Sequence, residues 1–255
     1  MISFDLTNWM MVFVRVSALL AIFPLFSTQN VPVQARLALG ALISFLLAPG
    51  LPTMAHAPTS LITLALLMAV EIGVGLLLGF VSRLLFYILE FAGNVISSEM
   101  GLNWGATLNP LSNTRSEVPG LMLFYLGAMA FLTLDMHQWI LRALQRSYQM
   151  LPIGGAHLGP ALFTDIVGRT SQLFLAGLLI AAPVIAVSFL INLVFSVIGR
   201  AVPQMNVFIE SFSFRVLAGL AVFGLSLNLM AQHVVNYLRR LPEDVLRVAQ
   251  LLGAG

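Results

Sequence analysis

The chain has 255 residues, of which 59% are hydrophobic and only 9% are charged. Soluble domains carry about a quarter of their residues as charged side chains, so this composition indicates an integral membrane protein. The sequence has no cysteine, which excludes disulfides, thiolate metal sites and a cysteine nucleophile. Its formal net charge of +2 is too small and too dispersed to favour a nucleic-acid partner.

Six apolar segments are candidates for membrane helices, because about twenty apolar residues cross a bilayer. Their uninterrupted runs lack the alternation of barrel strands, so we expect an all-α, multi-helix membrane protein of long, kinked helical hairpins. Pro183 predicts a kink in the fifth segment. The second segment lies between two prolines and is short for an independent crossing. The segments are residues 9–26, 33–48, 61–89, 121–141, 173–198 and 214–235.

The arginines divide almost evenly between the two sides of a six-span topology. The positive-inside rule therefore does not orient the chain, and a simple six-span bundle is not expected. One side holds Arg142, Arg146, Arg169, Arg239, Arg240 and Arg247, and the other holds Arg36, Arg83, Arg115, Arg200 and Arg215.

Five ionisable side chains lie within or at the edges of the apolar segments. An unpaired charge at the centre of a bilayer costs at least about 2.5–3.5 kcal/mol, so such groups are expected to be paired or hydrated. Salt bridges, such as one between Arg15 and Glu71, are favoured over a proton or ion relay, because no acidic cluster or repeated carboxylate–histidine spacing is present. The five are Arg15, Glu71, Arg83, Glu90 and Asp135.

Motifs for catalysis and for metal binding are missing from the sequence. It contains no Gly-rich phosphate loop, HExxH or GxSxG motif. Its four histidines are scattered, without the i, i+4 spacing of a helical metal site. We therefore expect a protein that is not an enzyme and that has no metal or cofactor.

Two connections between the apolar segments carry the informative polar residues. GRAVPQMNVF (199–208) predicts a tight helical hairpin, with Arg200, Pro203, Gln204, Asn206 and Phe208 as its motif. GLNWGATLNPLSNTRSEVPG (101–120) is a long polar stretch whose Gly and Pro residues cannot continue a helix. Loops of this length are usually functional or disordered.

Five further stretches are informative as a set: RVSALLAIFPLFSTQNVPVQARLALG (15–40), EIGVGLLLGF (71–80), GNVISSEMGLNWGATLNP (93–110), LPIG (151–154) and APVIAVSFLINLVFSVIGRAVPQMNVF (182–208). Together they resemble the FliR family of flagellar export-gate proteins, whose injectisome counterpart is SctT. The resemblance runs over nearly the whole chain, in the same order. Residues 172–240 are also similar to the two-helix partner FliQ.

This resemblance implies a single export-gate subunit over residues 1–255. It has a FliP-like part at 1–150 that carries the loop of about 101–120, fused to a FliQ-like hairpin at 172–240. The implied partners are FliP-like and FliQ-like membrane subunits, a FlhB-like export protein, membrane lipid and unfolded secreted proteins. The implied location is the bacterial inner membrane, multi-pass, in the flagellar basal body.

In the family, the matching loop enters the export channel as a plug. Met100 and Met122 flank this loop and would either contribute to the gate or simply pack. A disordered surface loop is the alternative interpretation. Carried over by position, the plug residues are Gly105, Asn109, Pro110, Leu111, Ser112, Asn113, Thr114 and Arg115.

For the whole chain, the alternatives are an injectisome subunit of the same family, a purely structural scaffold, or a transporter of small solutes or ions.

Overall fold

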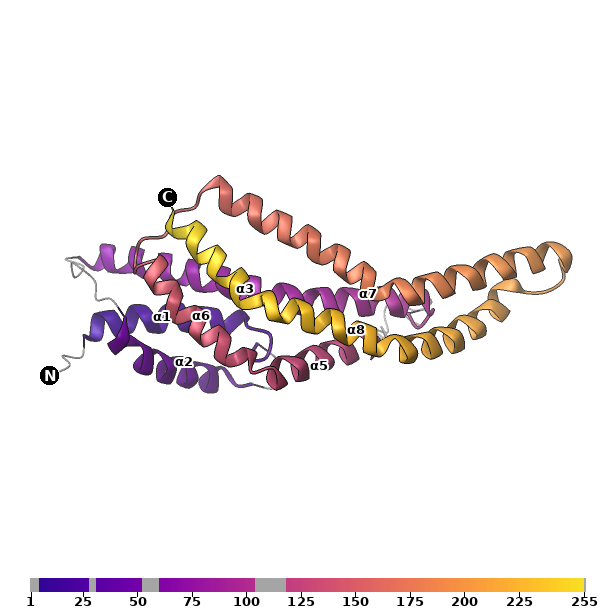
Figure 1. Cartoon of the computed structure of the whole chain (residues 1–255), viewed down its shortest axis with the longest axis horizontal. Helices are drawn as coiled ribbons and strands as arrows, with labels where there is room; N and C mark the ends of the chain where they lie inside the picture. Colours follow the sequence, from indigo (N-terminus) through magenta and orange to yellow (C-terminus); the bar gives the residue numbers. More distant parts are fainter. Residues whose placement is uncertain (1–4, 28–30, 52–59, 104–117, 255) are drawn as a thin grey trace. The chain divides into compact units, whose positions relative to one another are not determined.

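The computed structural model describes residues 5–27, 31–51, 60–103 and 118–254, apart from the side chain of Phe208. In this part of the chain there are seven α-helices, one short 3₁₀ helix and no β-strand, which confirms the predicted all-α fold (Figure 1). The helices are α1 (Leu6–Ile22), α2 (Val33–Leu47), η1 (Ala48–Gly50), α3 (Leu61–Glu99), α5 (Val118–Thr133), α6 (Met136–Met150), α7 (Pro160–Ala201) and α8 (Val207–Gly253).

Length and composition identify the helices that can cross a membrane. In the described residues, four qualify alone: Val33–Gly50, Leu61–Glu99, Pro160–Ala201 and Ile209–Gly253. The interrupted pair α5 and α6 counts as a fifth when taken together. The helices α3, α7 and α8 contain 39, 42 and 47 residues, about twice what one crossing needs, so each extends beyond the hydrocarbon layer or runs obliquely within it.

Helix boundaries differ from the hydropathy segments in two ways. The fourth segment, 121–141, consists of two helices, because Asp135 adopts a left-handed backbone conformation with φ 53° at the break between α5 and α6. The helices α3, α7 and α8 also continue well past the ends of their apolar runs. These extensions carry polar residues on one face. Their mean hydropathy is therefore low, although the backbone stays helical.

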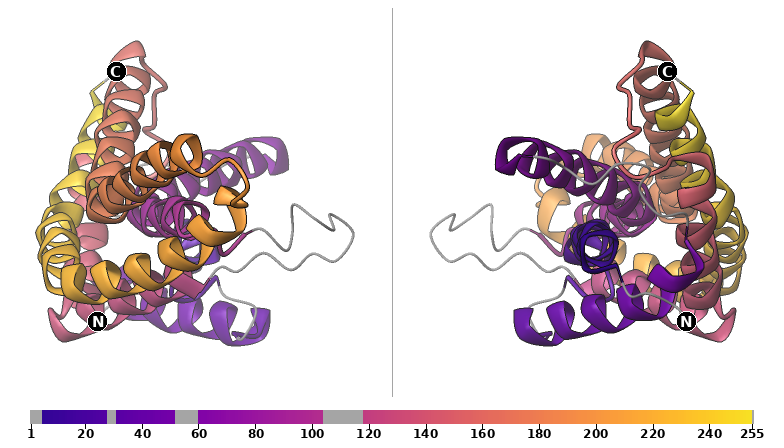
Figure 2. Two further views of the ribbon diagram at one scale, coloured as in Figure 1. Left: turned by 90° about the vertical axis from the view of Figure 1, so that its right-hand side faces the viewer. Right: turned by 90° about the vertical axis from the view of Figure 1, so that its left-hand side faces the viewer.

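The chain folds into two compact units. Unit 1 consists of Met1–Leu85, Leu132–Thr170 and Leu238–Gly255, and unit 2 consists of Phe86–Phe131 and Ser171–Tyr237. In unit 1, α1 lies between α2 and the first part of α3 (Figure 1 and Figure 2). Glycines allow these close approaches, because a Cβ at Gly40 would overlap Ser17 of α1, and one at Gly75 would collide with the carbonyl oxygen of Arg15.

Unit 2 is built from the end of α3, helix α5, and the hairpin formed by α7 and α8 around residues 202–206 (Figure 1). Aromatic rings tie these elements together: Phe91 of α3 meets Phe174 of α7 edge to face, with ring centroids 4.9 Å apart. Phe86 and Phe124 join α3 to α5 as a tilted pair, with ring centroids 5.4 Å apart. Such pairs prefer tilted or edge-on geometry because of the ring quadrupole.

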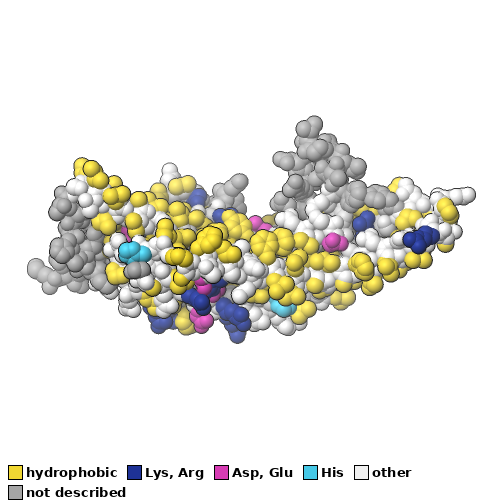
Figure 3. All heavy atoms as spheres, turned by 90° about the horizontal axis from the view of Figure 1, so that it is seen from above, with side chains coloured by type: hydrophobic (Ala, Val, Ile, Leu, Met, Phe, Trp, Pro, Cys, Tyr) yellow, Lys and Arg dark blue, Asp and Glu magenta, His cyan; other side chains and the backbone are white. Residues whose placement is uncertain are grey.

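Large apolar side chains are exposed along the long helices. Phe163 on α7 is 73% exposed and Leu225 on α8 is 85% exposed. Figure 3 shows one face of the molecule on which apolar side chains predominate and charged groups are few. An apolar surface of this kind needs lipid or other proteins as neighbours.

Candidate functional site

The predicted plug residues, Gly105 to Arg115, lie in 104–117 and are outside the described residues. The two ends of this stretch are described, and both belong to unit 2. We call them the loop base: the end of α3 with Gly101–Asn103, and the start of α5 at Val118–Gly120.

The first half of the loop base is a capped helix end. Gly101 has φ 79° and its N–H donates to the carbonyl of Ser98 at 3.0 Å, while the N–H of Leu102 donates to the carbonyl of Ser97 at 2.9 Å. These two bonds make a Schellman motif, in which glycine takes the left-handed position without strain. The hydroxyl of Ser188 on α7 donates to the carbonyl of Glu99 at 3.2 Å. The chain therefore leaves α3 at a fixed point.

The second half of the loop base depends on a contact between two backbones. A Cβ at Gly93 of α3 would overlap the Cα of Gly120 in α5, and it would lie 2.9 Å from the carbonyl carbon of Pro119. Pro119 and Gly120 are both buried. Since only glycine permits this approach, the entry into α5 is held against α3.

The two methionines beside the loop have different surroundings. Met100 is fully buried and packs on α8, where a Cβ at Gly219 would lie 2.5 Å from its Cγ. Met122 is 48% exposed on α5. Met100 thus packs inside unit 2, and Met122 is the one of the pair that is open to other neighbours.

The predicted hairpin motif forms the turn between α7 and α8. Arg200, Pro203 and Gln204 are exposed, and the side-chain oxygen of Asn206 accepts a hydrogen bond from the N–H of Ile209 at 3.4 Å, which caps α8. The side chain of Phe208 lies outside the described part. The motif therefore presents polar groups at the tip of the hairpin.

The buried charges of unit 1 form one connected centre. The Nε of Arg15 donates to Oε2 of Glu71 at 2.5 Å, and its Nη2 donates to Oε1 at 3.0 Å. Both side chains are completely buried. Because an unpaired buried charge is destabilising, this bidentate ion pair explains how α1 and α3 each accommodate an ionised group.

The same centre reaches the LPIG turn and α6. The Nη1 of Arg15 donates to the carbonyl of Leu151 at 3.2 Å, and the N–H of Gly154 donates to Oε1 of Glu71 at 2.9 Å. The guanidinium carbon lies 4.0 Å from the ring centroid of Tyr148. One ion pair thus joins α1, α3, α6 and the LPIG turn of unit 1. This arrangement suits a structural role better than a role in a proton or ion relay.

The other three predicted intramembrane charges lie elsewhere, and one of them, Glu90, is exposed on α3. Arg83 donates to the hydroxyl of Ser27 at 3.2 Å and to the carbonyl of Ile22 at 3.5 Å, at the end of α1. Asp135 is 64% exposed at the break between α5 and α6, with its carboxylate 3.9 Å from the ring of His137. Asp135 is thus a surface group at a helix break rather than part of a buried pair.

One charged network was not predicted from the sequence. In unit 1, Arg169 binds Asp165 at 2.5 Å and also binds Asp244, while Arg247 binds Asp165 at 2.9 Å. The i, i+4 spacing of Asp165 and Arg169 was the available signal. The network joins the start of α7 to the end of α8.

Comparison with known proteins identifies the family. Residues 6–241 match the model for bacterial export proteins, family 1. The chain is 30% identical over 242 residues to the flagellar biosynthetic protein FliR of Escherichia coli (strain K12), covering 93% of this chain and 92% of that protein. It is 30% identical over 251 residues to the protein of the same name from Pectobacterium carotovorum subsp. carotovorum, covering 96% of each. For the Bacillus subtilis (strain 168) protein of that name, identity is 27% over 214 residues, with 82% and 81% covered. The chain therefore belongs to the bacterial export protein family that contains the flagellar FliR proteins.

Proposed function

We propose that this chain helps to form the channel of the flagellar type III protein export gate, and that residues 105–115 plug the channel at rest. The chain is a membrane subunit of the flagellar export apparatus, a transport component. The injectisome and small-solute transporter alternatives are not favoured, because the relatives named above are flagellar proteins.

The loop base is the observation that supports the plug. A gate has to seal at rest and then move aside for an unfolded chain, so it needs a weakly held segment between fixed ends. Here the ends are fixed by the Gly101 cap and by the contact between Gly93 and Gly120. The segment between them, 104–117, contains two residues each of Asn, Ser and Thr, whose short polar side chains favour turns over apolar packing.

The proposed partners are FliP-like and FliQ-like membrane subunits and a FlhB-like export protein. The exposed apolar side chains of α7 and α8 give these subunits a surface to pack against. We assign residues 1–150 to a FliP-like part and 172–240 to a FliQ-like hairpin. The proposed setting is the bacterial inner membrane at the flagellar basal body. In this scheme the chain performs no catalysis, and export is energised by other components.

Deleting Ser112–Arg115 tests the plug. The tagged chain is co-expressed with its neighbouring membrane subunits, the complex is purified, and its mass is measured to confirm assembly. Ion leakage is then measured in vesicles that contain the complex. We expect the deletion to raise the leakage, and a four-residue deletion of 54–57, between η1 and α3, to leave it unchanged.

Two outcomes separate the proposal from its alternatives. If the deleted complex assembles with normal mass and leaks no more than the unmodified complex, the loop is not a plug and the chain acts as a scaffold. If the purified chain alone transports small solutes, and this transport is lost on neutralising Glu71 or Asp135, then the transporter interpretation replaces the gate.

A further inference from the structure

The last part of α8 belongs to unit 1, whereas the earlier part of this helix belongs to unit 2. We call residues 238–253 the α8 strap. Unit 1 is built from three separate stretches of the chain, and the strap lies in the last of them. Because synthesis runs from the N-terminus, unit 1 cannot be completed until all of unit 2 has been made.

The strap packs into unit 1 through an apolar stripe. Its members are spaced at i, i+3, i+4 and i+7, as on the buried face of an amphipathic helix. They are Val245, Val248, Ala249 and Leu252, none more than 1% exposed. The hydrophobic effect is non-directional, so this stripe favours docking of the strap without fixing its position along the helix axis.

Four charges fix the position of the strap against the start of α7. Asp244 of the strap binds Arg169, and Arg247 of the strap donates to Asp165 at 2.9 Å. Arg169 also binds Asp165 at 2.5 Å, so two arginines and two aspartates form one neutral network. The side chains of Asp165 and Arg169 are only 10% and 16% exposed. Removing a strap charge would leave a partner that is largely shielded from water, which is destabilising.

The end of the strap contacts the turn that the buried ion pair holds. The carbonyl of Leu252 accepts a hydrogen bond from the N–H of His157 at 2.8 Å. A Cβ at Gly253 would collide with the carbonyl oxygen of Met150, so the two backbones touch. The next carbonyl, at position 151, accepts from Arg15. Backbone contacts therefore connect the docked strap to the buried ion pair.

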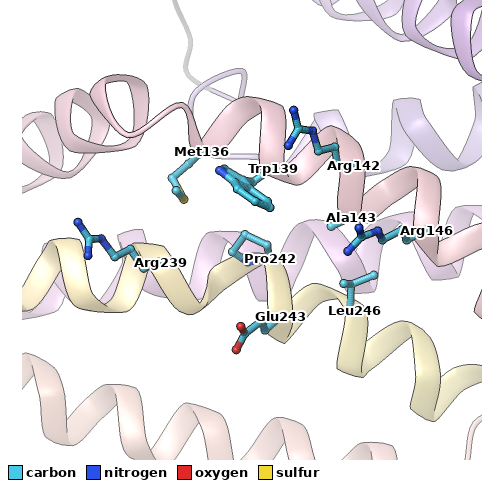
Figure 4. Close-up of a pocket in the computed structure, with 9 residues that line it drawn as sticks. All are labelled: Met136, Trp139, Arg142, Ala143, Arg146, Arg239, Pro242, Glu243 and Leu246. Carbon is cyan, nitrogen blue, oxygen red and sulfur yellow. The ribbon is translucent and has the colours of Figure 1, made fainter.

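Two features allow the strap to leave this position as a unit. Pro242 has no N–H, so the helical hydrogen bond to the carbonyl of residue 238 is missing where the strap begins. A cavity of about 400 Å³ is lined by residues of the strap and of α6. In Figure 4, Trp139 extends from α6 toward Pro242, while Glu243 points away from α6. Side chains beside a cavity lack packing partners there, so docking depends on the apolar stripe and the four charges.

We propose that the α8 strap closes unit 1 as the last step of its folding, and that the four-charge network holds it closed. While the strap is undocked, Asp165 and Arg169 lack their partners on α8, and the 150–157 turn lacks its backbone contacts. Only a chain that has been made through unit 2 presents a closed unit 1 to other subunits. This inference does not rest on the plug, so either one can fail without the other.

Thiol labelling of the full chain in detergent tests the proposal, since the sequence has no cysteine. Ala249→Cys places a thiol on the buried side of the strap, with Val248→Cys as a second reporter. Ser44→Cys places one at a fully buried position on α2 and reports unfolding of unit 1 as a whole. The rate of reaction with a maleimide measures how often each thiol becomes exposed.

Removing a network charge should release the strap alone. We expect D244N or R247Q to raise the labelling rate at position 249 roughly 10-fold and to leave that at position 44 unchanged. R169Q/D244N should label more slowly than the two single effects multiplied, because these side chains share one bond.

The matched controls E243Q and R240Q remove exposed strap charges that form no ion pair among the described residues. They should change the rate by less than about 2-fold. Co-expressed with the neighbouring membrane subunits, D244N/R247Q should yield less assembled complex, by mass measurement, than R240Q/E243Q.

Three results would overturn the proposal. Equal rates at position 249 in D244N and E243Q would show that the network does not hold the strap. Parallel increases at positions 249 and 44 would show that unit 1 unfolds as a whole, without separate opening of the strap. Undiminished assembly of D244N/R247Q, despite faster labelling, would show that closure is not needed before the subunits meet. Melting temperatures identify variants that are folded, and the two strap reporters should agree.

Discussion

Replacing Glu71 by leucine would leave the guanidinium of Arg15 buried without its counter-charge. Both side chains are completely buried and share two hydrogen bonds, so removing one partner should cost about 3–5 kcal/mol of unfolding free energy. The N–H of Gly154 would also lose its acceptor, at about 1–3 kcal/mol. At roughly 2–4 °C per kcal/mol for a chain of this size, the melting temperature should fall by at least about 6 °C.

A double variant distinguishes a structural role of the ion pair from a role of either charge in a proton or ion relay. In Arg15→Met/Glu71→Leu both charges are gone, and apolar replacement of a buried pair is often close to neutral. We expect the double variant to be more stable than Glu71→Leu alone and to support export of flagellar proteins in cells. The measurements are melting curves of the purified complexes and a motility assay. A structural role for the pair is contradicted if Glu71→Leu melts within about 2 °C of the unmodified protein, or if the double variant is stable yet inactive.

Glycine substitutions with matched controls test the loop base through melting temperatures. On α3, Gly93→Ala should cost about 1–3 kcal/mol because its Cβ would strike the α5 backbone. A Cβ at Gly73 would meet nothing within 4 Å, so Gly73→Ala should be neutral or stabilising by up to about 1 kcal/mol. On α8, Gly219→Ala should destabilise the fold, because its Cβ would clash with the buried side chain of Met100. Gly224→Ala should not, because a Cβ there would meet nothing within 4 Å. Gly101→Ala should cost about 1–2 kcal/mol through its positive φ. Equal effects within either glycine pair would contradict the packing described.

The all-α fold and the α7–α8 hairpin could be predicted from the sequence, because long apolar runs and a Pro-containing polar turn are local signals. The break between α5 and α6 could not be predicted, since it depends on the backbone of Asp135 alone. Hydropathy averages about twenty residues and does not register one left-handed residue. The polar extensions of α3, α7 and α8 were missed for a related reason, because they are helical without being uniformly apolar.

The candidate sites were predictable in part. Arg15 and Glu71 are opposite charges in two apolar segments. Their pairing could be predicted from the free-energy cost of an unpaired charge in the bilayer. Their bonds to Leu151 and Gly154 depend on contacts between residues far apart in the sequence. The cavity lined by Trp139 of α6 and Pro242 of α8 was missed for the same reason, because its lining comes from two helices that no sequence pattern relates. The plug remains a prediction, since its residues lie outside the described part.

Cross-linking from the loop to a protein in transit tests the central claim most directly. The chain has no cysteine, so Ser112→Cys provides a single thiol to carry a photo-activated cross-linker. An export substrate fused to a tightly folded domain is stalled in the assembled apparatus, and the same fusion without its export signal is the control. We predict a cross-linked adduct with the stalled substrate and none with the control. A stalled, fully assembled complex that yields no adduct at position 112 would contradict the proposal that this loop lies in the export path.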